Sequence, residues 1–302
     1  MPHVHNHHAI NIGSSNKGRL AFVIFFNIII TIAEYLGGIL SGSLALLSDA
    51  THNLSDVLSL AFGYVGEKVS EKQPNLDYSF GLRRFEVLTA LVNALILLGI
   101  GFYILIESFQ RYFNPVSISI AIMLPVACIG LFGNLFSIVM LHKTKDTSLN
   151  MKAAFLHLFY DTISSVAVIA GALLLWLTGL LWIDTIISLL IVIMITRSSW
   201  DIIRHALRIF LQIAPRDINT EEVYRNILSS ANAEEVHGLH IWAVNSSEVF
   251  LSCHILMGDD CSNYDDIIRT VNNMLKKQYG ITHTTIQVES SKICHLKDTC
   301  CR

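Results

Sequence analysis

Two short patterns of ionisable residues lie inside long apolar stretches of the chain. Each is a histidine followed four residues later by an aspartate: His52 with Asp56, and His157 with Asp161. On an α-helix, residues four positions apart lie on one face about one turn apart. Each helix would therefore direct an imidazole and a carboxylate toward one point. Two such pairs supply two nitrogen and two oxygen ligands, which predicts a tetrahedral Zn²⁺ site between two helices.

Ionisable residues at membrane depth are costly to bury, so they indicate function by default. Two carboxylates would neutralise a divalent cation, and the same ligands also suit Cd²⁺ or Co²⁺. If the two helices are antiparallel, the histidine of one lies level with the aspartate of the other, as in inverted-repeat transporters. The alternative for each pair is an interhelical hydrogen bond that holds a helix bundle together.

Asp49 lies close to His52 in the same apolar stretch. One interpretation makes it a gate at the outer mouth of the site, or a support that accepts a hydrogen bond from the His52 imidazole. The alternative is a residue at the end of a span, in interfacial water.

Composition places these motifs in a membrane protein. The chain has 302 residues, 52% of them apolar and 15% charged, and its mean hydropathy is +0.52. Average soluble proteins carry about 25% charged residues. A bilayer-spanning helix needs about 20 apolar residues. Runs of that length precede residue 206 at about 19–40, 43–66, 85–110, 117–141, 151–177 and 182–203.

Lysine and arginine gather in the loops on one side of these six spans, whereas the opposite loops carry only Arg111. Because cytoplasmic loops are enriched in these residues, we expect both termini in the cytoplasm. The net charge is −3 and no segment is strongly basic, which argues against a nucleic-acid partner.

Beyond residue 206 the composition becomes mixed and charged, which predicts a cytoplasmic α+β domain of order α-β-β-α-β. Thr220 would cap its first helix and Gly280 would end its second. The expected elements are helices 219–231 and 263–279 and strands 236–244, 248–257 and 283–290. We expect four regions in all: a His-rich cytoplasmic tail (1–16), a six-span transmembrane domain (17–206), a cytoplasmic α/β domain (207–291) and a Cys-containing tail (292–302).

Asn245-Ser246 between the first two expected strands is typical of a β-hairpin. If it forms a two-residue loop, His237 and His254 pair directly across the strands and share a face. The same count puts His240 one register step off that face. Ordinary, half-exposed strand histidines are the alternative to a functional pair.

Three functions fit a metal site at this depth. A transporter needs an energy source, and because the chain has no nucleotide-binding loop, a proton gradient is the economical one. An intramembrane zinc hydrolase would need an open fourth metal position and a separate base, for which Asp49 is available. A membrane-anchored zinc sensor would not need charged residues inside its spans.

Several segments together resemble the cation diffusion facilitator family, and the His-Asp pairs resemble its zinc branch. They are residues 43–56 (SLALLSDATHNLSD), 79–87 (SFGLRRFEV), 237–242 (HGLHIW) and 284–289 (TTIQVE), with the second His-Asp motif. The resemblance covers nearly the whole chain except its two tails.

The resemblance implies a homodimeric secondary active transporter, not an enzyme, that exports Zn²⁺ from the cytoplasm in exchange for H⁺ by alternating access. It implies a metallochaperone-like cytoplasmic domain that binds Zn²⁺. The transport ligands carry over onto His52, Asp56, His157 and Asp161. In the cytoplasmic domain, ligands carry over onto His237 and His254, with a further ligand from Gln287 or Glu289. We expect a multi-pass protein in the lipid bilayer of a bacterial inner membrane.

Residues near the two ends are weaker candidates for metal binding. The N-terminal cluster could collect zinc, and the C-terminal group could hold metal at a dimer interface. Cys128 and Cys253 are most simply buried apolar residues. The two terminal groups are His3, His5, His7 and His8, and Cys294, His295, Cys300 and Cys301.

Overall fold

The computed structural model describes residues 14–70, 72–142, 149–258 and 263–290. These residues divide into two compact units. A helical unit takes the described residues of 8–68 and 88–203, and the second unit takes those of 69–87 and 204–302.

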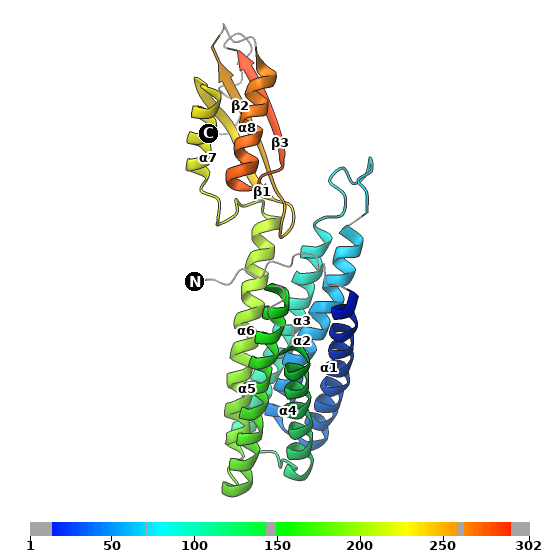
Figure 1. Ribbon diagram of the computed structural model, residues 1–302. Coiled ribbons are helices and arrows are strands. Elements are labelled where there is room, and N and C mark those ends of the chain that lie inside the picture. The colour runs from blue at the N-terminus through cyan, green and yellow to red at the C-terminus, as the bar shows by residue number, and fades with distance from the viewer. Residues whose placement is uncertain (1–13, 71, 143–148, 259–262, 291–302) are drawn as a thin grey trace. The chain divides into compact units, whose positions relative to one another are not determined.

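Six long helices correspond to the six predicted spans (Figure 1). Among the described residues, four of them are long and apolar enough to cross a membrane, namely α3, α4, α5 from Leu158 and α6, while α1 contributes a shorter apolar stretch, Phe25–Ser41. Helix α2 carries the polar residues of the first motif. The six helices are α1 (Ser14–Ser41), α2 (Leu44–Ser70), α3 (Phe85–Phe113), α4 (Ile120–His142), α5 (Leu149–Thr178) and α6 (Trp182–Phe210).

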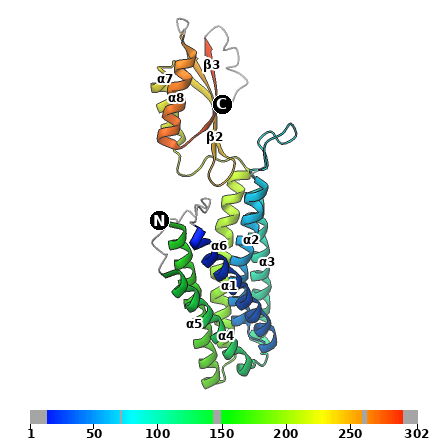
Figure 2. The same ribbon diagram turned by 45° about the vertical axis from the view of Figure 1, so that its right-hand side comes forward.

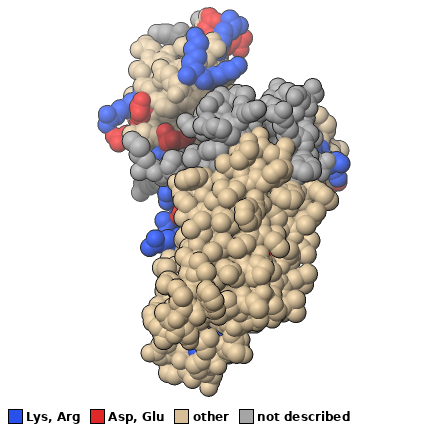
Figure 3. All heavy atoms as spheres, turned by 60° about the horizontal axis from the view of Figure 1, so that its bottom comes forward, with Lys and Arg blue, Asp and Glu red and all other residues tan. Residues whose placement is uncertain are grey.

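The helical unit presents an apolar surface. Large side chains such as Phe102, Phe132 and Leu177 are more than 60% exposed, and the face drawn in Figure 3 has very few charged residues over these helices. An apolar exposed belt of this kind marks a surface that contacts lipid or another apolar partner. Inside, one buried cluster contains residues of each helix from α2 through α6, among them Leu46 of α2, Met123 of α4 and Val168 of α5.

Helix α2 begins against a carboxylate that comes from α6. Asp184 accepts hydrogen bonds from the Ser43 hydroxyl (2.5 Å) and from the backbone N–H groups of Leu44 (2.7 Å) and Ala45 (3.3 Å). The first N–H groups of a helix have no partner within it, and a negative charge there also interacts favourably with the helix dipole. Asp184 is 2% exposed, so this cap fixes the start of α2 inside the bundle.

The C-terminal domain has the predicted order α-β-β-α-β, which the structure confirms. Strand β2 lies at the centre of the sheet, antiparallel to β1 and parallel to β3 (Figure 2). Alternate residues of β2, among them Leu251 and Ile255, point into a core with residues of both helices. The elements are α7 (Thr220–Ala231), β1 (Glu235–Ala243), β2 (Val249–Met257), α8 (Tyr264–Tyr279) and β3 (His283–Ser290).

The ends of the two helices test the predicted caps. Thr220 is not the cap of α7, because Asn219 accepts hydrogen bonds from the N–H groups of Glu221 and Glu222 through its side chain. Gly280 ends α8 in the left-handed conformation, at φ 68°, as predicted. The cap of α7 lies one residue earlier than predicted because an asparagine side chain reaches the second and third helical N–H groups well.

Candidate metal centres

One histidine and one aspartate of the two motifs meet in the helical unit. His52 of α2 and Asp161 of α5 form an ion pair with 3.2 Å between Nε2 and Oδ1, and their side chains are 27% and 5% exposed. The pair therefore joins two helices through a buried carboxylate and a half-buried imidazole. One imidazole nitrogen and one carboxylate oxygen at this separation are half of the ligand set that the sequence predicts.

The other two predicted ligands lie on the same two helices. Asp56 follows His52 by four residues within α2, and His157 precedes Asp161 by four residues within α5. The side chains of Asp56 and His157 lie outside the described part of the chain. Their position in the helices agrees with a shared face, since residues four apart are helical neighbours.

Asp49 connects α2 to α5 through serine side chains. Its Oδ1 accepts a hydrogen bond from Ser164 (2.5 Å) and its Oδ2 accepts one from Ser165 (3.3 Å). Ser165 in turn accepts a hydrogen bond from Asn134 of α4 at 3.2 Å. With an exposure of 1%, Asp49 lies in the interior and not in interfacial water.

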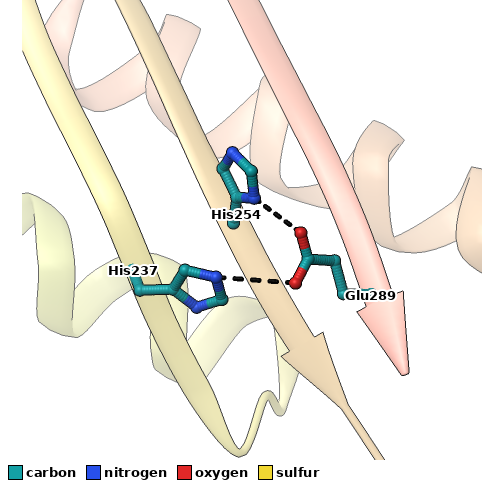
Figure 4. A group of neighbouring side chains, drawn as sticks. All are labelled: His237, His254 and Glu289. Carbon is teal, nitrogen blue, oxygen red and sulfur yellow. Dashed lines mark hydrogen bonds and ion pairs between the residues drawn. The ribbon is translucent and has the colours of Figure 1, made fainter. Parts of the chain in front are cut away.

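A second group of candidate ligands lies on the sheet of the C-terminal domain. His254 Nδ1 is 2.6 Å from Glu289 Oε1, and His237 Nε2 is 3.5 Å from Glu289 Oε2 (Figure 4). One ligand atom from each of these three residues lies within 4.8 Å of the other two. Two imidazoles and one carboxylate suit a divalent metal such as Zn²⁺ and leave a position for a fourth ligand.

The burial of Glu289 supports metal binding by these three residues. Glu289 is 3% exposed, whereas the side chains of the two histidines are 17% and 23% exposed. A buried carboxylate requires compensating hydrogen bonds or a cation. Gln287 supplies one such bond, because its amide nitrogen donates to Glu289 Oε1 at 2.8 Å. Gln287 therefore orients the carboxylate, as partners of metal ligands commonly do.

The two histidines pair as predicted, but by a different route. The strands end at Ala243 and Val249, so the hairpin loop is longer than Asn245-Ser246, and the prediction of a two-residue loop is wrong. A bulge between His237 and His240 offsets the longer loop and restores the pairing of His237 with His254. Gly238 lies in this bulge with a φ of 57°, a conformation that glycine adopts without strain.

The bulge also changes the position of His240. His240 pairs with Ser252, two residues from His254 and on the same face of β2, so the prediction that it lies off that face is wrong. His240 does not belong to the three-residue group of possible ligands. His283, at the start of β3, stacks on Phe250 with 4.0 Å between ring centroids.

The cysteines divide between described and undescribed parts of the chain. Cys253 is 1% exposed, as predicted for a buried apolar residue, and burial raises the pKa of its thiol to about 12. Cys128 is only half-buried. The N-terminal histidine cluster and the C-terminal Cys/His group both lie outside the described residues.

Several residues that organise the helical unit were visible in the sequence only as polar residues in apolar runs. Asp184, Glu34 and Asn134 are examples, and each has a hydrogen-bond partner on another helix. Polarity in a span is the signal that marks them. Their partners could not be identified from the sequence, because each bond joins segments far apart along it.

Comparison with known families assigns both units. Residues 20–211 match the model of the cation efflux transmembrane domain. Residues 215–291 match the model of the cation efflux protein cytoplasmic domain, which is a dimerisation domain of these transporters. Together the two matches cover most of the chain.

Known proteins resemble the chain over nearly its full length. It is 34% identical to the metal cation efflux system protein CzcD of Cupriavidus metallidurans, over 95% of this chain and 89% of that protein. It is also 34% identical to the cadmium, cobalt and zinc/H(+)-K(+) antiporter of Bacillus subtilis (96% and 93%). The identity to the zinc transporter ZitB of Escherichia coli is 31% (99% and 97%).

A solved structure, the metal-bound C-terminal domain of the CzcD transporter, matches at 30% identity with a TM-score of 0.23, covering 24% of this chain and 99% of that one. The members of the family are transporters, which excludes the hydrolase considered above. The chain thus belongs to the cation efflux family, whose members move metal cations across membranes.

Proposed function

We propose that this protein exports Zn²⁺ from the cytoplasm in exchange for H⁺, through a site formed by His52, Asp56, His157 and Asp161. The observation that carries the proposal is the 3.2 Å contact between His52 of α2 and Asp161 of α5. It supports a shared site because an imidazole nitrogen of one motif lies beside a carboxylate oxygen of the other. Relatives named as zinc transporters and as a cadmium, cobalt and zinc antiporter support the substrate class.

Proton exchange follows from the chemistry of the ligands. A histidine or an aspartate binds a metal only when it is deprotonated, so metal and protons compete for the same atoms. Histidine titrates near physiological pH, where a modest gradient changes its occupancy. A site that opens to each face of the membrane in turn then exchanges Zn²⁺ for H⁺ without a nucleotide. The ligands also accept Cd²⁺ and Co²⁺.

The distribution of lysine and arginine favours a cytoplasmic location for both termini and the C-terminal domain. The matched dimerisation domain supports a homodimer. Because the relatives named above are bacterial, we assign the protein to a bacterial inner membrane.

Zinc flux into proteoliposomes tests the transport proposal. The wild-type chain should move Zn²⁺ when an opposing pH gradient is imposed, and collapse of the gradient should stop the flux. Asp161→Asn keeps the shape of the side chain but removes its charge, and we expect the flux to fall by at least about tenfold. Asp201→Asn, at an exposed position of α6, is the matched control and should retain the flux.

The same experiment has an outcome that would refute transport. Wild-type protein that binds Zn²⁺ but moves none under any pH gradient would leave the membrane-anchored zinc sensor as the better account. Flux that persists after the gradient collapses would refute proton exchange alone.

We also propose that His237, His254 and Glu289 bind Zn²⁺ in the cytoplasmic domain, with Gln287 orienting the carboxylate. The proposal rests on their mutual distances and on the burial of Glu289. The test is the zinc content of the full-length purified protein. The double variant His237→Ala/His254→Ala should bind one zinc fewer per chain, and His240→Ala, which changes a neighbouring exposed histidine, should not. An unchanged zinc content in the double variant would refute this site.

A further inference from the structure

A buried carboxyl group of α1 forms a second ionisable centre in the helical unit. Glu34 is 0% exposed, and its Oε2 accepts a hydrogen bond from Asn53 of α2 at 2.6 Å. Its Oε1 is buried and has no hydrogen-bond partner among the described residues. Half of this carboxyl group is therefore neither solvated nor hydrogen-bonded to the described chain.

The space that Glu34 occupies is provided by a glycine of α4. A Cβ atom at Gly130 would overlap Glu34 Oε1, so any other residue there would displace the carboxyl group. Helix α1 packs along α4. Gly130 therefore lets the two helices approach while an ionisable side chain lies between them.

Among the described residues, the charged groups whose fields act on Glu34 are two acids, Asp49 of α2 and Asp161 of α5, and the latter is one of the proposed metal ligands. A carboxylate with an unpaired oxygen, shielded from water and close to two other acids, is electrostatically costly. A proton on Oε1 removes that charge. A divalent cation at the His52–Asp161 site would supply positive charge in its place.

We infer that Glu34 is a proton-binding site coupled to the metal site, and that it lies outside the metal ligand set. It holds a proton when the metal site is empty. When Zn²⁺ binds between α2 and α5, the O–H bond of the carboxyl group breaks, the proton passes to water and the carboxylate remains. No group is oxidised or reduced. The inference rests on the proposed function of the metal site and adds a proton carrier to it.

Proton release on zinc binding tests the inference. The full-length protein in detergent would carry His237→Ala/His254→Ala, so that binding reports the intramembrane site. Calorimetric titration with Zn²⁺ in buffers of different ionisation enthalpy gives the protons released per zinc. Glu34→Gln is neutral at every pH and keeps the acceptor for Asn53. We expect it to lower proton release by about one per zinc.

The pH dependence of the Zn²⁺ affinity should report the same released proton. At low pH, Glu34→Gln should bind Zn²⁺ as tightly as the unsubstituted protein. As the pH rises, its affinity should fall behind by up to about tenfold per pH unit, the slope for one linked proton. Glu34→Asp keeps a titratable carboxyl and should retain the proton release. Glu107→Gln removes a carboxylate that pairs with Arg111 on α3, and as the matched control it should change neither quantity.

Three outcomes would overturn the inference. Unchanged proton release in Glu34→Gln shows that Glu34 carries no coupled proton. Loss of Zn²⁺ binding at every pH in folded Glu34→Gln shows that Glu34 is a metal ligand. If Glu34→Gln does not fold, infrared difference spectra of the protein with Glu34 intact decide, since failure of Zn²⁺ to remove a protonated carboxyl band overturns the inference. Absence of Zn²⁺ binding before Glu34 is changed refutes the transport site itself.

Discussion

His52 Nε2 and Asp161 Oδ1 lie 3.2 Å apart although they belong to helices α2 and α5, each of which carries one His-Asp motif. The contact places one nitrogen and one oxygen donor side by side in the interior of the bundle. Around it, Asp49 bonds to Ser164 and Ser165, so the same two helices are joined by further hydrogen bonds.

The identity of the donor at position 52 should set metal preference. His52→Asp replaces an imidazole nitrogen with a carboxylate oxygen, which alters the balance of nitrogen and oxygen ligands. We expect the Zn/Cd transport ratio to shift toward Cd²⁺ by about tenfold, a difference of about 1.4 kcal/mol. Paired flux measurements with the two metals in the same proteoliposomes give the ratio. An unchanged ratio would mean that His52 does not contribute to selectivity.

Gly238 should be required for the geometry of the cytoplasmic histidines. Its φ is 57°, and a Cβ atom there would lie 3.3 Å from His254 Cδ2. Gly238→Ala should therefore lower the free energy of unfolding by about 1–2 kcal/mol, the cost of the left-handed conformation for alanine. It should also weaken zinc binding, because the alanine methyl group presses on the His254 imidazole.

Gly280→Ala separates these two effects. Gly280 has a φ of 68°, but a Cβ atom there meets nothing within 4 Å. Both variants should lose stability in thermal unfolding, and only Gly238→Ala should lose zinc affinity in titrations. Equal zinc affinities for the two variants would contradict a close fit of Gly238 to His254.

The cap of α2 should affect both stability and transport. Asp184→Ala removes the carboxylate that accepts three hydrogen bonds from Ser43, Leu44 and Ala45. Loss of a helix cap costs about 0.5–2 kcal/mol. We expect a lower thermal midpoint in detergent and a lower zinc flux, since α2 carries His52. If Asp184→Ala behaves like Asp201→Ala, in which an exposed carboxylate of α6 is removed, the cap has no such role.

Cys253 should stay unreactive in the folded protein. Burial raises the pKa of its thiol from 9.0 to about 12, so the neutral form is favoured in the folded state. Iodoacetamide at pH 8 should label it only after unfolding, as mass spectrometry of the digested protein would show. The raised pKa also makes the stability of the protein depend on pH. Between about pH 9 and 12 an unfolded chain loses this proton first, so stability should fall as the pH rises through that window, by up to about 1.4 kcal/mol per unit.

Replacing Cys253 isolates the contribution of its thiol to the pH dependence of stability. Cys253→Ala removes the titrating thiol, so its stability should fall less steeply above pH 9 than that of the unsubstituted protein, although it starts lower because of the cavity. Parallel slopes for the two proteins would show that Cys253 does not titrate differently in the folded and unfolded states.

Local patterns in the sequence were sufficient to predict most of the elements. Apolar length marks the six helices, and alternation marks the strands, because each pattern depends on residues that are neighbours along the chain. The glycine that ends α8 was predictable for the same reason. The motif spacing likewise predicts that His52 and Asp56 share one helix face.

The tertiary structure decided what joins these elements. The bulge at Gly238 keeps His237 opposite His254 despite the longer hairpin loop, and it moves His240 onto their face. The bulge reconciles the length of the hairpin loop with the pairing of the strands, so it cannot be predicted from the sequence of one strand.

Contacts between segments far apart in the sequence also depend on the tertiary structure. The cap of α2 by Asp184 and the contact of Glu34 with Asn53 each join two helices. The order of residues along the chain is enough to show that these polar residues lie within apolar segments, where burial is costly and a partner is needed. Which partner each one meets depends on how the helices pack, because hydrogen bonds act only over a few ångströms in space. Packing is a property of the folded chain as a whole.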